Sequence, residues 1–129
     1  MISVTDLRTH LADVVNANEP LVRRGRLLNA VFLFGVDEKT FYITVREGRV
    51  TEIEEGPKPL KDVAFSIRGS SEAWNEFWKP APKAGFYDIL GLAKLRHARI
   101  EGNVQVLLTH LRYVKELLAA PRGRLEASS

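Results

Sequence analysis

The sequence predicts an α+β fold in which helices pack on one face of a mostly antiparallel five-stranded sheet. Short segments of alternating apolar and polar residues between positions 31 and 67 indicate strands joined by tight turns. Apolar residues at helical spacing flank them at positions 3–17 and 104–119. The 129 residues favour one domain, 1–129, whose end at 122–129 is expected to be a loose tail.

The first helix is expected over residues 3–17. Its apolar residues recur every three or four positions, at Val4, Leu7, Leu11, Val14 and Val15. Ser3 or Thr5 can cap its start, and the segment around Pro20 ends it. Residues 21–29 are basic and are expected to be irregular.

Four strands are expected next. The apolar run 31–34 favours a strand buried on both faces, and alternation marks strands at 41–45, 50–53 and 63–67. Gly48 supplies the turn between the second and third strands because glycine adopts positive φ without steric cost. The pattern predicts an antiparallel meander, with a fifth strand at 96–101.

The remaining elements begin at recognisable caps. Ser70 caps a helix that must stop before Pro80, and Asp88 caps a short helix or turn within 85–93. Gly102 and Asn103 form a turn, and Asn103 caps a single closing helix over 104–119.

Aromatic residues are concentrated in one short segment. Five of the eleven fall within fourteen positions, interrupted by Pro80, Pro82 and Gly85: Trp74, Phe77, Trp78, Phe86 and Tyr87. A kinked helical segment must therefore bring large flat side chains together. Such a segment is either the centre of a core or the wall of an apolar cavity.

The closing helix carries two apolar stripes. One contains Val104, Leu107, Leu108, Leu111 and Leu118, and the other contains Val106, Tyr113 and Leu117 with His110 in its line. One stripe docks on the sheet. Three partners can cover the second: the aromatic segment, a ligand held between that segment and the helix, or a partner subunit.

Composition excludes several classes of protein. The chain has no cysteine, so disulfides and thiolate chemistry are excluded. Neither a secretory leader nor a membrane-spanning run is recognisable, which favours a cytoplasmic protein without stable membrane insertion. The net charge is +3, but the aromatic residues do not interleave with the basic ones, so nucleic-acid binding is not expected.

Catalytic signals are weak. His10, His97 and His110 do not have the spacing of metal ligands, and the sequence holds no nucleophile elbow and no phosphate-binding glycine loop. Asp88 can be a buried acid, but helix capping explains it more simply. We therefore expect no catalytic residue, no metal and no cofactor, which favours a binding protein over an enzyme.

Three segments resemble the sterol carrier protein type-2 domain, a family with many bacterial members. FYITVREGRVTEIEEG (41–56) is similar to its strand–turn–strand pair, DVAFSIRGSSEAWNEFW (62–78) to its strand and S-x-E-x-W helix, and RIEGNVQVLLTHL (99–111) to its last strand and closing helix. Together they cover about half of the chain. Asn103 stands where the family has Asp, residues 79–95 replace a shorter connection, and residues 1–20 have no counterpart.

The resemblance implies a five-stranded sheet that encloses an apolar tunnel, and a non-enzymatic role in lipid binding or transfer. The implied ligand is a fatty acid, an acyl-CoA or a sterol-like molecule, whose acidic head group would meet Lys94, Arg96 or His97. The expected ligand-binding residues are Trp74, Phe77, Trp78, Phe86, Tyr87, Leu90, Leu92, Leu107, Leu108 and Leu111. The alternative is an interaction module or accessory subunit that forms a homodimer through the same apolar surface.

Overall fold

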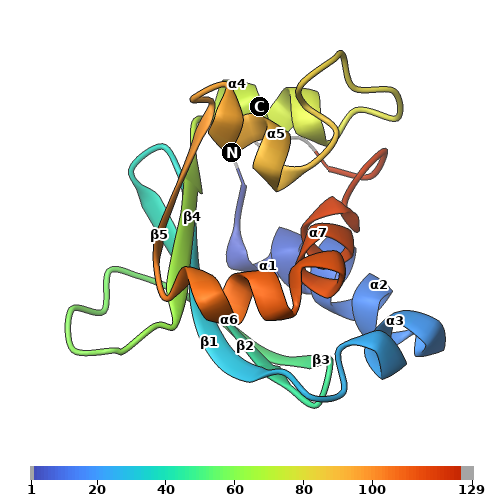
Figure 1. The fold of residues 1–129 in the computed structure, drawn as a ribbon, viewed down its shortest axis with the longest axis vertical. Coiled ribbons are helices and arrows are strands. Elements are labelled where there is room, and N and C mark those ends of the chain that lie inside the picture. The colour runs from blue at the N-terminus through green and yellow to red at the C-terminus, as the bar shows by residue number, and fades with distance from the viewer. Residues whose placement is uncertain (1, 126–129) are drawn as a thin grey trace.

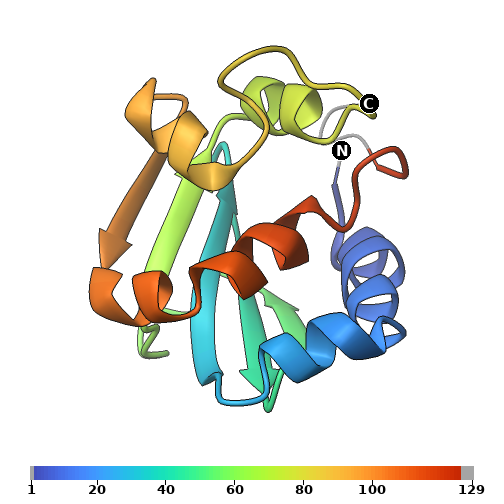
Figure 2. The ribbon, with the colours of Figure 1, turned by 45° about the vertical axis from the view of Figure 1, so that its right-hand side comes forward.

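The computed structural model describes residues 2–125, which form a five-stranded sheet with helices over one face (Figures 1 and 2). This is the predicted α+β fold class. The strands are β1 (Asn29–Val36), β2 (Lys39–Arg46), β3 (Arg49–Glu55), β4 (Phe65–Gly69) and β5 (Ala98–Gly102). Their order across the sheet is β3-β2-β1-β4-β5, so β1 is central and β5 lies at an edge.

The sheet is mostly antiparallel, with one parallel pair. The expected meander holds for β1, β2 and β3, but β4 pairs with β1 in parallel, with Phe34 opposite Ile67. The prediction of a four-strand antiparallel meander was therefore wrong. Alternating Phe65 and Ile67 reveal a strand and its buried face, but alternation carries no information about which strand is its neighbour.

The helical N-terminal segment consists of α1 (Val4–Leu7), the π-helical turn η1 (Arg8–Ala12) and α2 (Asp13–Asn16). Ser3 caps it as predicted: its hydroxyl accepts from the Asp6 N–H, and the Asp6 carboxylate accepts from the Ser3 N–H. The expected irregular stretch 21–29 instead begins within α3 (Glu19–Arg24). The reason is that Asn18 caps a new helix and Pro20 lies in its first turn, where proline is tolerated.

The aromatic segment contains two short helices, α4 (Ser71–Phe77) and α5 (Ile89–Lys94). The caps predicted for them are confirmed, because Ser70 accepts from the Ala73 N–H and Asp88 accepts from the Gly91 N–H. Both helices lie at the same end of the sheet, above β4 and β5 (Figure 2).

The closing segment is two helices, α6 (Val104–Thr109) and α7 (Leu111–Ala119), and not the single helix predicted over 104–119. Asn103 caps α6 as expected. The helix breaks at His110, whose φ of −115° and ψ of 25° are not helical. The Thr109 hydroxyl donates to the Gln105 carbonyl four residues back, an interaction that bends helices.

This break changes which apolar residues dock on the sheet. In α7 both predicted stripes are buried, through Tyr113, Leu117 and Leu118. In α6 Leu107 is buried, but Val104 and Leu108 are exposed by 42% and 50%. The predicted stripe that contains Val104 and Leu108 therefore faces outward over part of its length.

Candidate functional site

Aromatic side chains of α4 and of its C-cap, Trp78, form a buried cluster in the core. Trp74, Phe77 and Trp78 are at most 1% exposed. They surround Phe34 of the central strand, whose ring centroid lies 4.7 Å from that of Trp74 and 6.0 Å from that of Trp78. Phe77 meets Trp74 edge-on at 5.3 Å. In this structure the cluster fills the space between α4 and the sheet.

Both indole N–H groups are used inside the protein. Trp74 donates to the Gly35 carbonyl and Trp78 donates to the Leu118 carbonyl, each at 2.9 Å. These bonds tie α4 to β1 on one side and to α7 on the other. Because a buried indole N–H needs a partner, the two bonds fix the orientation of both rings.

The other residues expected to bind a ligand divide into two groups. Leu92 and Leu107 are buried, Leu111 is half-buried, and Phe86 is 8% exposed and stacks on His97 with ring centroids 4.4 Å apart. Tyr87, Leu90 and Leu108 are exposed by 56%, 38% and 50%. The predicted set thus runs from the core to the surface, and its contact with a ligand stays a prediction.

The C-terminal segment contributes residues that the sequence did not reveal. Arg122 lies 5.0 Å from the centre of the Phe77 ring and donates to the carbonyls of Phe77 and Tyr87, each at 2.9 Å. The Gly123 N–H donates to the Trp78 carbonyl at 2.7 Å. Residues 122–125, expected as part of a loose tail, are therefore anchored on the aromatic segment, and 126–129 lie outside the described residues.

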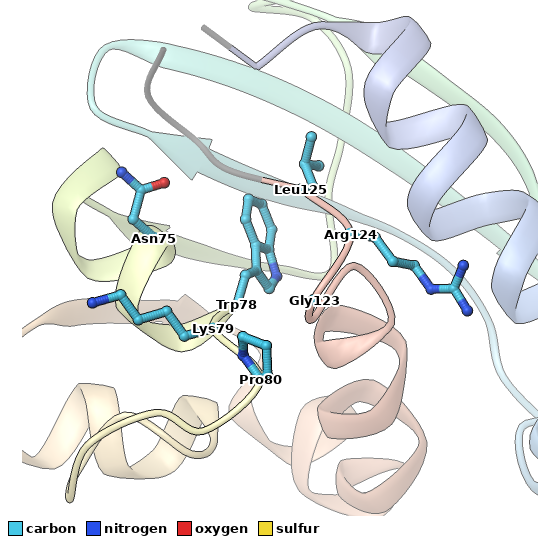
Figure 3. A pocket seen from close by; sticks show the side chains of 7 residues that line it. All are labelled: Asn75, Trp78, Lys79, Pro80, Gly123, Arg124 and Leu125. Carbon is cyan, nitrogen blue, oxygen red and sulfur yellow. The ribbon is translucent and has the colours of Figure 1, made fainter.

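A pocket of about 550 Å³ lies where this segment meets α4 (Figure 3). The edge of Trp78, Pro80 and Leu125 give it apolar walls, and Lys79 stands at its side. Asn75, Gly123 and Arg124 complete the lining. The pocket combines apolar surface with two basic side chains, Lys79 and Arg124, of which Lys79 pairs with Glu76, and such a lining suits an amphipathic molecule.

Asp88 joins α5 to α7. Its carboxylate accepts from the Gly91 N–H at 2.8 Å and lies 3.3 Å from the Lys115 ammonium. Burial acts to raise the pKa of Asp88, but the Gly91 hydrogen bond and the Lys115 charge together bring it below its ordinary value. Asp88 is therefore ionised at neutral pH, a poor state for a general acid.

Metal ligands do not gather in the described part of the chain. Within residues 2–125, no three side chains of His, Asp or Glu lie closely enough together to hold a metal ion. The helices of the same residues are also too short or too polar to cross a bilayer.

Comparison with known proteins rests on solved structures. No protein-family model matches the sequence, and no curated protein sequence matches it. A conserved hypothetical protein of Thermus thermophilus, described as possibly a sterol carrier protein, superposes with a TM-score of 0.74 at 12% identity, over 100% of this chain and 92% of its own. Sterol carrier protein 2 superposes at 0.73 and 11% identity, over 93% of this chain and 95% of its own.

A third neighbour is described as palmitated. This protein, SCP2L2 of Aedes aegypti, superposes with a TM-score of 0.59 at 11% identity, over 91% of this chain and 95% of its own. At such identities the likeness establishes the fold. The chain therefore has the sterol carrier protein type-2 fold predicted from its motifs.

Proposed function

We propose that this chain is a non-enzymatic lipid-binding or lipid-transfer protein that holds an acyl chain, a sterol or a similar apolar molecule. The observation that carries the proposal is the sterol carrier fold combined with exposed apolar side chains on α5 and α6. The palmitated form of the Aedes aegypti neighbour supports a ligand with a long alkyl chain.

We infer that the ligand contacts the exposed leucines of α5 and α6. Leu90 of α5 and Leu108 of α6 are exposed, whereas Leu92 and Leu107 on the same two helices are buried in the core. An alkyl chain that enters beside the exposed leucines gains the contacts that they lack in the free protein. Each buried CH₂ contributes about 0.8 kcal/mol, so eight carbons supply roughly 6 kcal/mol before the costs of binding.

The non-enzymatic assignment is supported by the state of Asp88, the residue considered as a candidate buried acid. It serves as a helix cap and as the partner of Lys115, and both interactions favour its charged form. Neither a proton transfer nor a nucleophilic step is needed to hold an apolar molecule.

Displacement of a fluorescent fatty acid tests the proposal. Leu90→Glu and Leu108→Glu place a charge where an alkyl chain must pass, so each should weaken binding without unfolding the protein. Leu27→Glu is the matched control, because Leu27 is a leucine that is 75% exposed in the linker between α3 and β1. Failure of the wild-type protein to take up the fatty acid, with no co-purified lipid in native mass spectrometry, would contradict the proposal.

The same exposed leucines favour one alternative, an interaction module that forms a homodimer. Sedimentation velocity separates the two functions. A ligand-free dimer that dissociates in the Leu108→Glu protein supports the interaction module, whereas a monomer that takes up fatty acid supports the lipid carrier.

A further inference from the structure

A groove of about 590 Å³ follows the outer edge of the sheet at β5. Its three arginines come from three places: Arg68 of β4, Arg99 of β5, and Arg96 from the link between α5 and β5, where His97 also lines the groove. The remaining lining residues are Ala93, Ala98 and Ile100. Figure 1 shows this edge of the sheet, with β5 outermost and α5 at its upper end.

Arg68 and Arg99 stand directly opposite each other on neighbouring antiparallel strands. Cβ atoms of such cross-strand partners are about 4.5–5.5 Å apart, and like charges there destabilise a sheet. Room for Arg68 comes from Gly35 of β1, since a Cβ at that position would lie 2.9 Å from the Arg68 Cγ. The sheet therefore carries two arginines at opposed positions of β4 and β5, and both line the groove.

Arg96 brings a third guanidinium group to the groove. Its φ of +65° lies in the left-handed region, which side chains with a Cβ rarely adopt. The hydrogen bond from the His97 N–H to the Leu92 carbonyl, at 2.7 Å, closes the chain around this residue. The turn that ends α5 therefore leads the chain into β5, and Arg96 lines the groove together with Ala98, Arg99 and Ile100.

Within residues 2–125, no carboxylate forms an ion pair with these arginines. Among the ion pairs and side-chain hydrogen bonds of residues 2–125, none involves the guanidinium of Arg68, Arg96 or Arg99. Glu101 lies two residues beyond Arg99 on β5, but none of the ion pairs of the described residues joins it to Arg99. The lysines beside β3 differ, because Lys58 and Lys61 both pair with Glu54.

We propose that this groove binds a phosphate monoester, either as a soluble ester or as a lipid head group. A guanidinium group offers a planar fork of donors that matches phosphate oxygens. Three such groups suit a ligand that carries about −1.5 to −2 charges and three acceptor oxygens better than a single carboxylate. The lipid form rests on the proposed lipid-binding function, whereas the soluble form does not.

Titration of the ¹⁵N-labelled chain with inorganic phosphate, at constant ionic strength, tests the site by NMR. Phosphate should shift the amide signals of 97–100 and the Nε–H signals of Arg68 and Arg99. Loss of one charge-assisted contact should weaken binding about tenfold in Arg68→Gln and in Arg99→Gln. Arg23→Gln is the control, because Arg23 is an exposed arginine outside the groove, and its Kd should stay within about twofold.

Folding of the variants is checked by circular dichroism and by the melting temperature. Both glutamine variants should fold, since each removes one of two opposed like charges. If either glutamine variant unfolds, Arg99→Lys replaces it in the test. This variant keeps the positive charge but removes the guanidinium fork, so its affinity for phosphate should also fall. Unchanged affinity in a folded Arg99→Lys protein contradicts recognition by the guanidinium fork.

Vesicle flotation then separates the two sources of the phosphate. Phosphatidylcholine vesicles with phosphatidic acid carry a monoester, and vesicles with phosphatidylserine at equal charge do not. Binding that prefers phosphatidic acid and is lost in Arg99→Gln assigns a lipid head group, whereas phosphate binding without flotation assigns a soluble ester. The proposal is overturned if the amide signals of 97–100 do not shift with phosphate, or if Arg23→Gln weakens phosphate binding as much as Arg99→Gln does. Fatty-acid displacement by the Arg99→Gln protein should be unchanged, so that a failure of the phosphate site can be told apart from a failure of lipid uptake.

Discussion

The hydroxyl of Tyr113 is the polar link between the closing helix and the sheet, and its removal should lower stability measurably. Tyr113 is 1% exposed, and its hydroxyl donates to the Gly48 carbonyl at 2.6 Å, in the turn between β2 and β3. The substitution Tyr113→Phe keeps the ring and removes only this donor. Any loss of stability can then be assigned to the hydrogen bond.

The expected magnitude follows from the burial of both partners. Gly48 is buried, so its carbonyl loses its donor in a place that water reaches poorly. An unsatisfied buried acceptor costs about 1–3 kcal/mol. In a chain of this size 1 kcal/mol corresponds to about 4 °C, so the melting temperature should fall by about 4 to 12 °C.

The same residue predicts a dependence on alkaline pH. Burial raises the pKa of Tyr113 above its ordinary value of 10.0. Above pH 10 the tyrosine of the unfolded chain loses its proton while the folded one keeps it, so the unfolded state binds fewer protons and stability falls as the pH rises. The Tyr113→Phe protein lacks this contribution to the alkaline loss.

Urea denaturation at pH 7 and pH 11 measures both effects. The control is Tyr42→Phe, because the Tyr42 hydroxyl makes longer bonds to the Lys58 backbone, at 3.2 and 3.3 Å, in a loop that water reaches. Tyr42→Phe should cost less than about 1 kcal/mol. A Tyr113→Phe protein within about 0.5 kcal/mol of wild type, with the same alkaline loss, would refute the reasoning.

Three further predictions concern other contacts. Gly25→Ala should destabilise the protein by about 1–3 kcal/mol, since a Cβ there collides with the ring of Tyr113, and urea denaturation should show a smaller cost in a Tyr113→Leu background. Hydrogen bonds to Glu52 and Lys61 lower the pKa of Glu54 to about 2. Lys61→Met removes one of these bonds and should raise that pKa, which a ¹³C NMR titration of the Glu54 carboxyl group would measure. Arg122→Lys keeps the charge but loses the two carbonyl bonds, so amides of 86–88 should exchange faster with deuterium; unchanged exchange would assign no anchoring role to Arg122.

Much of the fold could be predicted because local signals and tertiary structure agree. The apolar run 31–34 marked the first strand, and alternating apolar residues such as Phe41, Ile43 and Val45 marked later ones. The side-chain caps at Ser70, Asp88 and Asn103 marked three helix starts. A capping side chain bonds to a backbone N–H within three residues, so the local sequence is enough to predict the cap. The same holds for the Gly48 turn, whose φ is +82°.

The rest depends on contacts between distant residues. The residues around Phe65 carry no local signal that this strand pairs with β1. Likewise, the residues around Arg122 carry no local signal that its guanidinium donates to the Phe77 carbonyl. The break at His110 was missed because the apolar spacing continues through it. That break decides the exposure of Leu108, and so the division of the candidate site between core and surface.

The parallel pairing of β4 with β1 has a consequence for the order in which the sheet assembles. β1, β2 and β3 pair through short turns, whereas β4 joins β1 only after the chain has passed two intervening strands. Closing the longer loop costs more entropy, so we expect the three-strand hairpin region to form first and the β4–β5 region to dock later. In native-state hydrogen exchange β5 should then open at lower free energy than β2, and equal opening energies would contradict this order. The arginine groove would thus lie on the half of the sheet that opens more readily.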